Sequence, residues 1–235
     1  MDKETMDSLK IDLVTYASET GEMRAYLAMP KGGKKLPAVL VIHAIKGLDA
    51  HIEDVARSVA VEGFIALAPD ALSPQGGTPK DPEQTAALIK ALDRQEAIKN
   101  YLAAVKYLKT HPMSTGKVGV IGFCWGGGMA NELAVNSTDL SAVVPYYGMQ
   151  PVLEDVPKIK TPLLLHYAGI DEQFNKGIPA FEAALKNAGI DYQLYMYEGT
   201  KHAFNNDTNP ERYDKEAAKL AWKRTISFLK ERLKA

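Results

Sequence analysis

The chain has 235 residues, of which 46% are hydrophobic and 24% charged, and its formal net charge is -1 at pH 7. Because lysine and arginine are scattered rather than clustered, these values argue against a surface built to bind nucleic acid or an anionic membrane. The charged N-terminal segment lacks the apolar stretch of a secretory signal, and no run approaches the ~18 apolar residues of a membrane span. Because the chain has a single cysteine, it cannot form an internal disulfide. We therefore expect a cytoplasmic protein with one domain over residues 1–235.

The first half of the chain alternates between short apolar runs, which predict strands, and segments of helical period. A helix over residues 52–60 is expected to end at Gly63, and the loop Asp70–Pro82 is the expected lid because it is rich in proline and glycine. The predicted strands, of which the first two form a pair turned at Glu19–Gly21, are Ile11–Tyr16, Arg24–Met29, Ala38–His43 and Phe64–Ala68.

The second half continues the alternation and defines the fold class. A long helix through Ile98, Leu102 and Val105 is expected to close at His111–Pro112, and the chain ends in a helix with Trp222, Ile226, Leu229 and Leu233 on one stripe. Between them, strands are predicted at Val118–Phe123, Ala142–Tyr146, Pro162–Ala168 and Tyr192–Tyr197, with a helix at Ile178–Ala188 before the last strand. This order predicts an α/β fold with a mostly parallel central sheet and helices on both faces, and a ligand site at the carboxyl ends of the strands.

A glycine-rich turn around Cys124 follows a predicted strand and opens a predicted helix. The segment Gly122-Phe123-Cys124-Trp125-Gly126 has the pattern of a nucleophile elbow, G-x-S-x-G, with cysteine in place of serine. The helix N-terminus favours a thiolate, and the Trp125 N–H is placed to be one donor of an oxyanion hole. A lone cysteine is more often a small buried apolar residue, but this context favours a nucleophile.

An acid and a histidine follow the elbow in the chain order of a catalytic triad. Asp171 comes just after the Pro162–Ala168 strand, and His202 comes directly after the last predicted strand. Asp171 is alternatively a turn or cap residue, and Glu172 and Asp191 are the other acids near this position. A surface loop position is the alternative for His202.

Two further histidines, His43 and His166, lie at strand ends. Each either lines the same pocket or is a core histidine with its hydrogen bonds satisfied, and the second interpretation is favoured. Tyr146 and Tyr147, together with Trp125, either wall an aromatic pocket or belong to the core. No cluster of His, Asp and Cys has the spacing of metal ligands, so neither a metal nor another cofactor is expected.

Together these residues resemble the dienelactone hydrolase family of α/β-hydrolases, over nearly the whole chain from Ala38 to Leu229. The resemblance implies the α/β-hydrolase fold, a triad of Cys124, Asp171 and His202, and oxyanion-hole donors at the main-chain N–H groups of Ile45 and Trp125. It rests on several separate motifs, which are Val41-Ile42-His43 with Gly47-Leu48, Ala68-Pro69-Asp70, Lys117-Val118-Gly119, Gly122-Phe123-Cys124-Trp125-Gly126-Gly127, Asp171 and His202-Ala203-Phe204.

The chain departs from the family's pattern at two places. Where the family usually has a glutamate that helps to activate the cysteine, this chain has Ala44, so activation is expected to fall to His202 and the helix terminus. An arginine that grips the substrate's carboxylate in the type enzyme is replaced by Asn206 in the pocket, and the Ala71–Pro79 loop has no arginine. The resemblance therefore implies a substrate other than a dienelactone carboxylate.

The resulting hypothesis is hydrolysis of small carboxylic esters or lactones through a thioester on Cys124. Two alternatives stay open. One is hydrolysis of organophosphate triesters at the same nucleophile, and the other is a non-catalytic module that binds or senses small molecules through a reactive thiol. In each case the expected partner is a small molecule, with no nucleic acid and no membrane, and the protein acts as a monomer or homodimer.

Overall fold

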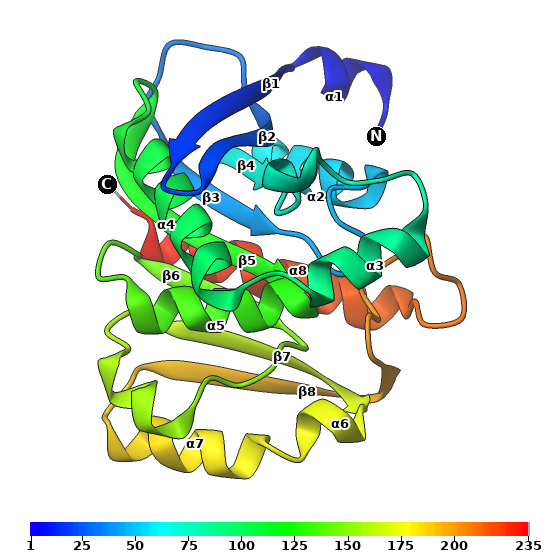
Figure 1. Ribbon diagram of the computed structural model, residues 1–235, viewed down its shortest axis with the longest axis vertical. Helices are drawn as coiled ribbons and strands as arrows, with labels where there is room; N and C mark the ends of the chain where they lie inside the picture. Colours follow the sequence, from blue (N-terminus) through cyan, green and yellow to red (C-terminus); the bar gives the residue numbers. More distant parts are fainter. Residues whose placement is uncertain (235) are drawn as a thin grey trace. The chain divides into compact units, whose positions relative to one another are not determined.

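The computed structural model describes residues 1–234 (Figure 1). The chain divides into two compact units. The first unit spans Met1–Val118 together with Lys234, and the second spans Gly119–Leu233. The boundary between them falls inside strand β5 (Ser114–Phe123) rather than in a linker. For that reason we keep the prediction of one domain over residues 1–235, of which residue 235 lies outside the described part.

The first unit contributes four strands in the order β1-β2-β4-β3. The first two form a hairpin in which Ser18 pairs with Gly21, β4 runs antiparallel to β2, and β3 runs parallel to β4. Helices α2 and α4 both contact these strands. The elements are α1 (Lys3–Asp7), β1 (Leu9–Ser18), β2 (Gly21–Pro30), β3 (Leu36–Ile42), α2 (Ala50–Val61), β4 (Ile65–Pro69), the 3-10 helix η1 (Ser73–Gln75), α3 (Pro82–Lys90) and α4 (Arg94–Thr110).

Helix α2 illustrates why the sequence pattern predicted these elements well. The Asp49 carboxylate accepts a hydrogen bond from the Ile52 N–H at 3.0 Å and so caps the first turn. Just after the helix, Gly63 adopts a left-handed backbone with φ of 97°, which ends the helix as predicted. The apolar stripe faces the core, because its members are all buried: Ile52, Val55, Ala56, Val59 and Ala60.

The second unit contributes the strands β5-β6-β7-β8, which are all parallel. Helix α5 contacts β6, and α8 contacts β6 and β7; in Figure 1, α5 and α7 lie in front of these strands and α8 lies behind them. The prediction of a mostly parallel sheet with helices on both faces is therefore confirmed. Besides β5, the elements are α5 (Trp125–Asn136), β6 (Ala142–Tyr146), the 3-10 helix η2 (Leu153–Lys158), β7 (Leu163–Ile170), α6 (Glu172–Asn175), α7 (Ile178–Asn187), β8 (Tyr192–Lys201) and α8 (Lys215–Arg232).

The stretch before β5 differs from the sequence prediction. Helix α3 was not predicted, and it precedes α4 with a break around Ala91. Each helix has its own aspartate cap, since the side chains of Asp81 and Asp93 accept hydrogen bonds from main-chain N–H groups of the following turn. Asp70, at the start of the expected lid, accepts three hydrogen bonds from Leu72 and Thr78, which hold that loop in an ordered turn.

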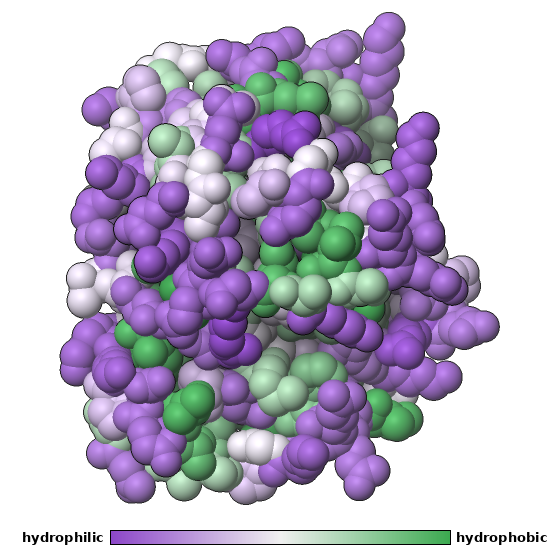
Figure 2. Space-filling model, viewed as in Figure 1, coloured by the Kyte–Doolittle hydropathy of each residue, from purple (hydrophilic) through white to green (hydrophobic). Residues whose placement is uncertain are grey.

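The central strands are buried, whereas the surface is mainly hydrophilic. All residues of β4 and β6 are buried, as expected for parallel strands covered on both faces. On the face drawn in Figure 2, hydrophilic side chains predominate and hydrophobic ones gather in separate patches. Within residues 1–234, no helix combines the length and the apolar character that crossing a membrane requires.

Candidate active site

Cys124 lies between the end of β5 and the start of α5, in the second unit. Its backbone has φ of 56° and ψ of -114°, a conformation that costs a non-glycine residue free energy and occurs mainly at functional sites. The Cys124 N–H donates to the Tyr146 carbonyl oxygen at 3.0 Å, and the Cys124 carbonyl accepts from the Gly128 N–H at 3.1 Å. The elbow predicted from the sequence is therefore present, with the side chain at the N-terminus of a three-turn helix.

Two of the glycines around Cys124 are required by close backbone contacts. A Cβ atom on Gly122, in β5, would collide with the carbonyl group of Gly126 in the first turn of α5. A Cβ on Gly127 would approach the Tyr146 carbonyl oxygen to 2.6 Å, closer than real Cβ atoms come. These contacts let α5 begin directly against β5 and β6, and so they hold the thiol at the carboxyl ends of the strands.

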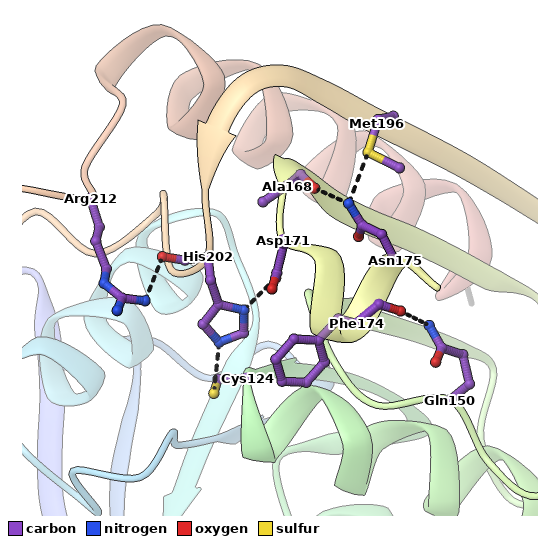
Figure 3. Close-up of polar contacts among 9 residues, drawn as sticks. All are labelled: Cys124, Gln150, Ala168, Asp171, Phe174, Asn175, Met196, His202 and Arg212. Atoms are coloured by element: carbon purple, nitrogen blue, oxygen red, sulfur yellow. Dashed lines mark hydrogen bonds and ion pairs between the residues drawn. The ribbon is translucent and has the colours of Figure 1, made fainter. Parts of the chain in front are cut away.

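His202 bridges Cys124 and Asp171 (Figure 3). Its Nε2 lies 2.9 Å from the Cys124 Sγ, and its Nδ1 lies 2.6 Å from the Asp171 Oδ2. A carboxylate only accepts hydrogen bonds, so Nδ1 carries a proton and Nε2 faces the sulfur. The Asp171 side chain is 7% exposed and that of His202 is 16% exposed, so this hydrogen-bond chain is largely shielded from water.

Asp171 occupies the N-cap position of α6 and yet does not cap it with its side chain. Its carboxylate hydrogen-bonds to His202 instead, so the side-chain cap considered from the sequence is absent, and a catalytic role for Asp171 stays a prediction. The other two acids considered lie elsewhere. Glu172 is exposed, and Asp191 forms an ion pair with Arg232 at 2.7 Å.

The imidazole ring of His202 is held between two aromatic side chains. The Phe174 ring stacks on it with 4.5 Å between centroids, and the Tyr147 ring meets it edge-on at 4.9 Å. Non-glycine residues with a positive φ among residues 1–234 all lie at this site: Cys124, Tyr147 and Ala203, which follows His202. Strained backbone conformations that gather around one reactive group are typical of a functional site.

Phe174 was not identified from the sequence, because it lies on a four-residue helix that has no periodic pattern. Two side-chain amides, one of Gln150 and one of the helix residue Asn175, hold that helix in place (Figure 3). The Gln150 amide donates to the Phe174 carbonyl at 3.0 Å, and the Asn175 amide donates to the Ala168 carbonyl at 2.7 Å. Arg212, which was also missed, donates to the His202 carbonyl at 3.4 Å.

Tyr146, Tyr147 and His166 have the environments of core residues, since their exposed fractions are 2% or less. His166 uses both ring nitrogens, with Nε2 at 3.0 Å from the Thr225 hydroxyl and Nδ1 at 2.9 Å from the Tyr197 hydroxyl. Burial, and secondarily the charge of Arg224, lowers the pKa of His166 to about 3, so this ring is neutral. Burial also raises the pKa of Tyr147 well above its ordinary value, which keeps the phenol protonated beside His202.

The remaining predicted residues have identifiable contacts. His43 and Ile45 belong to the first unit and follow β3; the His43 side chain is fully buried. Asn206 is half-buried and accepts hydrogen bonds from the Thr208 N–H and hydroxyl at 2.9 and 2.7 Å, so it shapes the turn after His202. Among residues 1–234, no group of three His, Cys, Asp or Glu side chains could hold a metal ion.

Comparison with known proteins gives a match over most of the chain. The model of the dienelactone hydrolase family matches residues 23–233. A protein of Saccharolobus solfataricus named "Putative carboxymethylenebutenolidase" is 34% identical over 92% of this chain and 97% of its own length. A Bradyrhizobium protein named "Probable 2-oxo-3-(5-oxofuran-2-ylidene)propanoate lactonase" is 31% identical over 95% of both chains.

Solved structures agree with this match. A dienelactone hydrolase-like promiscuous phosphotriesterase from metagenomic libraries has a TM-score of 0.87 at 23% identity and covers 97% of this chain and 100% of that one. A dienelactone hydrolase from Anabaena variabilis has a TM-score of 0.76 at 21% identity, with the same coverage. These likenesses confirm the predicted α/β-hydrolase fold.

Proposed function

Because the chain belongs to the dienelactone hydrolase family, we propose that it cleaves small carboxylic esters or lactones with Cys124 as nucleophile and His202 as base and acid. As a member of that family it is a hydrolase of esters or lactones. The observation that carries the mechanism is the hydrogen-bond chain from Asp171 through both nitrogens of His202 to the Cys124 sulfur. Asp171 keeps the imidazole in the tautomer whose Nε2 faces the sulfur.

The first step transfers the acyl group to the enzyme. The Cys124 thiolate attacks the carbonyl carbon, a C–S bond forms, and the carbonyl π electrons move to oxygen. The tetrahedral oxyanion then collapses and breaks the bond to the alcohol oxygen. That oxygen takes its proton from the His202 imidazolium, which leaves a thioester on Cys124 and a neutral imidazole. In a lactone, the new alcohol stays attached to the acyl group.

The second step releases the acyl group to water. Neutral His202 takes a proton from a water molecule through Nε2, and the hydroxide attacks the thioester carbon. Collapse of the second tetrahedral intermediate breaks the C–S bond and frees the carboxylic acid. The electron pair of that bond stays on sulfur, so the thiolate is restored beside the His202 imidazolium. After the acid has ionised, the cycle has consumed one water molecule and released one proton.

We propose that the main-chain N–H group of Trp125 donates to the oxyanion of both steps, and the family resemblance implies the Ile45 N–H as a second donor. Trp125 is the first residue of α5, where N–H groups point away from the helix along its axis. Ile45 is the second residue of a turn from Ala44 to Gly47 that is closed by a 3.1 Å hydrogen bond. Removing one such donor costs about 3–4 kcal/mol of transition-state stabilisation in comparable enzymes.

His202 and the N-terminus of α5 are proposed to activate Cys124, because Ala44, at the position of the family's glutamate, has no carboxylate. The partial positive charge of the helix end favours the thiolate, as does the imidazolium of His202 at 2.9 Å. The proposed resting state is thus a thiolate–imidazolium pair. The Phe174 ring, stacked on the imidazole, supports the charged form of that pair.

A stopped-flow experiment with p-nitrophenyl acetate tests this function. The wild-type protein should release a burst of p-nitrophenolate, equal to the enzyme concentration, and then turn over steadily; Cys124→Ala should show neither phase. A burst without turnover would contradict hydrolysis and favour the sensing alternative. Equal activity of Cys124→Ala would contradict the nucleophile.

Phosphotriester hydrolysis at the same thiolate is the second candidate. The solved phosphotriesterase shares the fold of this chain, so phosphotriesters are the substrate class to compare with carboxylic esters. Steady turnover of p-nitrophenyl acetate should exceed that of diethyl p-nitrophenyl phosphate, because deacylation by water suits a carbonyl carbon. A higher turnover of the phosphotriester would favour the alternative.

A further inference from the structure

Gln150 follows β6 and connects elements of the second unit through its side-chain amide. The amide nitrogen carries two N–H donors, and it lies 3.0 Å from the Phe174 carbonyl oxygen and 3.3 Å from the Tyr167 hydroxyl. Tyr167 is on β7 and only 1% exposed, so this end of the contact is fixed in the core. The amide also packs against Gly177, which has no room for a Cβ there. The Gln150 side chain is thus held in one place between β7 and α6.

The main chain at Gln150 is tied to α5, the helix that begins at the Cys124 elbow. The Met149 carbonyl belongs to the same peptide group as the Gln150 N–H, and it accepts a hydrogen bond from the Asn131 amide at 2.9 Å. Asn131 lies in α5 and is fully buried. A path of covalent and hydrogen bonds therefore runs from α5 through Gln150 to α6.

Helix α6 needs such contacts because it is too short to be stable by itself. A helix of four residues forms few internal hydrogen bonds, and the last carbonyl groups of any helix need partners from outside it. The Phe174 carbonyl is one of these groups, and Gln150 supplies its donor. The Asn175 amide adds a second tether, to the Ala168 carbonyl of β7 at 2.7 Å. Together these contacts fix where the Phe174 side chain lies.

The Phe174 ring lies between Gln150 and the His202 imidazole (Figure 3). Its uncharged face, stacked at 4.5 Å, favours the imidazolium form. Glu172 at the start of α6 and Lys176 just after it are exposed. The titratable and charged groups of the second unit that contact His202 are Asp171, Cys124, Tyr147 and Arg212.

We infer that Gln150 is a positioning residue, which holds α6 so that the Phe174 ring stays stacked on His202. The inference rests on the proposed function, because it requires a reactive pair of Cys124 and His202. Gln150 acts through Phe174 in this role, and substituting it removes no member of the triad. The charge of the pair then depends on a side chain outside the triad.

Two substitutions remove the Gln150 tether without adding a charge. Gln150→Met keeps nearly the same side-chain length and volume but has no N–H donor. Gln150→Asn keeps the amide but is one methylene shorter, so it does not reach the Phe174 carbonyl. Asn136→Leu is the matched control, because it also removes an amide that donates to a main-chain carbonyl, that of Glu132 at 2.8 Å, at the other end of α5.

The readout is the pH profile of Cys124 alkylation by iodoacetamide. At about pH 6–7, both Gln150 variants should react about 2- to 10-fold more slowly than the wild type, because part of the cation–π attraction is lost. Their rates should converge with the wild-type rate above about pH 9, where a thiol ionises without help. Asn136→Leu should follow the wild type at every pH. A purely structural role of Gln150 would lower the midpoint of urea unfolding and leave the profile unchanged.

A double-mutant cycle shows whether Gln150 acts through Phe174. In a Phe174→Leu background the ring is absent, so adding Gln150→Met should slow alkylation at about pH 6–7 by no more than about 1.5-fold further. An equal slowing in both backgrounds would overturn the inference. It would also be overturned by a wild-type profile in either Gln150 variant, or by a slowing that is the same at every pH.

Failure of the proposed function would give a different result. A free-cysteine profile in the wild-type protein, or hydrolysis of p-nitrophenyl acetate by Cys124→Ala, would contradict the reactive pair itself. The inference alone fails if the wild-type protein is alkylated fast well below pH ~8.5 and the Gln150 variants match it.

Discussion

The phenyl ring of Phe174 lies almost parallel to the imidazole ring of His202, with 4.5 Å between the centroids and 15° between the planes. The negative face of an aromatic ring attracts a cation placed over it. This contact therefore favours the imidazolium form of His202, which is the form that pairs with a Cys124 thiolate in the proposed resting state.

Replacing Phe174 should weaken that pair without removing either member. In Phe174→Leu, alkylation by iodoacetamide at about pH 6–7 should slow by about 2- to 30-fold, which corresponds to the loss of about 0.5–2 kcal/mol of cation–π attraction. The rates of variant and wild type should converge above about pH 9, where a thiol ionises without help. Phe174→Tyr keeps an aromatic ring stacked on the imidazole, so its alkylation rate should equal that of the wild type. A slowing that is the same at every pH would contradict this explanation.

The wild-type protein should itself show an unusual pH profile of alkylation. A free cysteine loses reactivity as the pH falls below about 8.5, because the thiolate is the reactive form. The neighbouring His202, at 2.9 Å from the sulfur, should keep alkylation of Cys124 fast well below that pH. His202→Ala should restore the profile of free cysteine. A wild-type profile like that of free cysteine would rule out the thiolate–imidazolium resting state.

Asp171 should matter far more to catalysis than the two acids near it in the sequence. Loss of the orienting acid lowers kcat by about 10⁴-fold in a serine protease, and Asp171→Asn should act in the same direction by about 10²- to 10⁴-fold. Asp191→Asn removes only the ion pair with Arg232, and Glu172→Gln alters an exposed side chain. The kcat of both variants should therefore stay within about 2-fold of the wild-type value. The kcat of the three variants is measured in steady-state hydrolysis of p-nitrophenyl acetate. If Asp191→Asn or Glu172→Gln lowered kcat more than Asp171→Asn does, the altered residue would replace Asp171 as the orienting acid.

Gly122 and Gly128, both close to Cys124, should respond to alanine in opposite directions. A methyl group on Gly122 meets the Gly126 carbonyl, so Gly122→Ala should lower the free energy of unfolding by about 1–3 kcal/mol or more. Gly128 is inside α5, and the nearest atoms to its added Cβ are 3.5 Å away. Gly128→Ala should therefore raise the free energy of unfolding by up to about 1 kcal/mol. Urea denaturation should show a lower free energy of unfolding for Gly122→Ala and a higher one for Gly128→Ala than for the wild type.

His166 should make the fold sensitive to moderate acid. Its pKa is lowered to about 3 in the folded protein, whereas an unfolded histidine titrates near 6.5. Between these values the unfolded chain binds a proton that the folded protein does not, so stability is lost as the pH falls from about 6.5 towards 3. The loss from this residue is at most about 1.4 kcal/mol for each pH unit in that window.

The variant His166→Gln removes the titrating group and isolates this effect. Urea denaturation between about pH 7 and 4.5 should show a smaller fall in the free energy of unfolding for His166→Gln than for the wild type. Its stability at pH 7 should also be lower, because the Thr225 and Tyr197 hydroxyls lose well-placed partners. Parallel falls in the two proteins would show that other groups carry the acid sensitivity.

The sequence by itself determined the features that depend on short stretches of chain. The strands of the sheet, the five buried positions of α2 and the elbow at Cys124 follow from local periodicity and from glycines in a tight turn. The order of nucleophile, acid and histidine was also readable, because each follows a recognisable strand. Parallel strands end at one edge of the sheet, which is why residues from positions 124, 171 and 202 were expected to meet.

Tertiary structure alone decided the features that depend on contacts between distant segments. Three acids were candidates from the sequence, and only the packing shows that Asp171 faces His202 while Asp191 faces Arg232. A strand-end histidine has the same local pattern whether it lines a pocket or is buried, so the hydrogen bonds of His166 could not be read from it. Phe174 gave no signal because its neighbour His202 comes 28 residues later in the chain, and no local pattern encodes that distance.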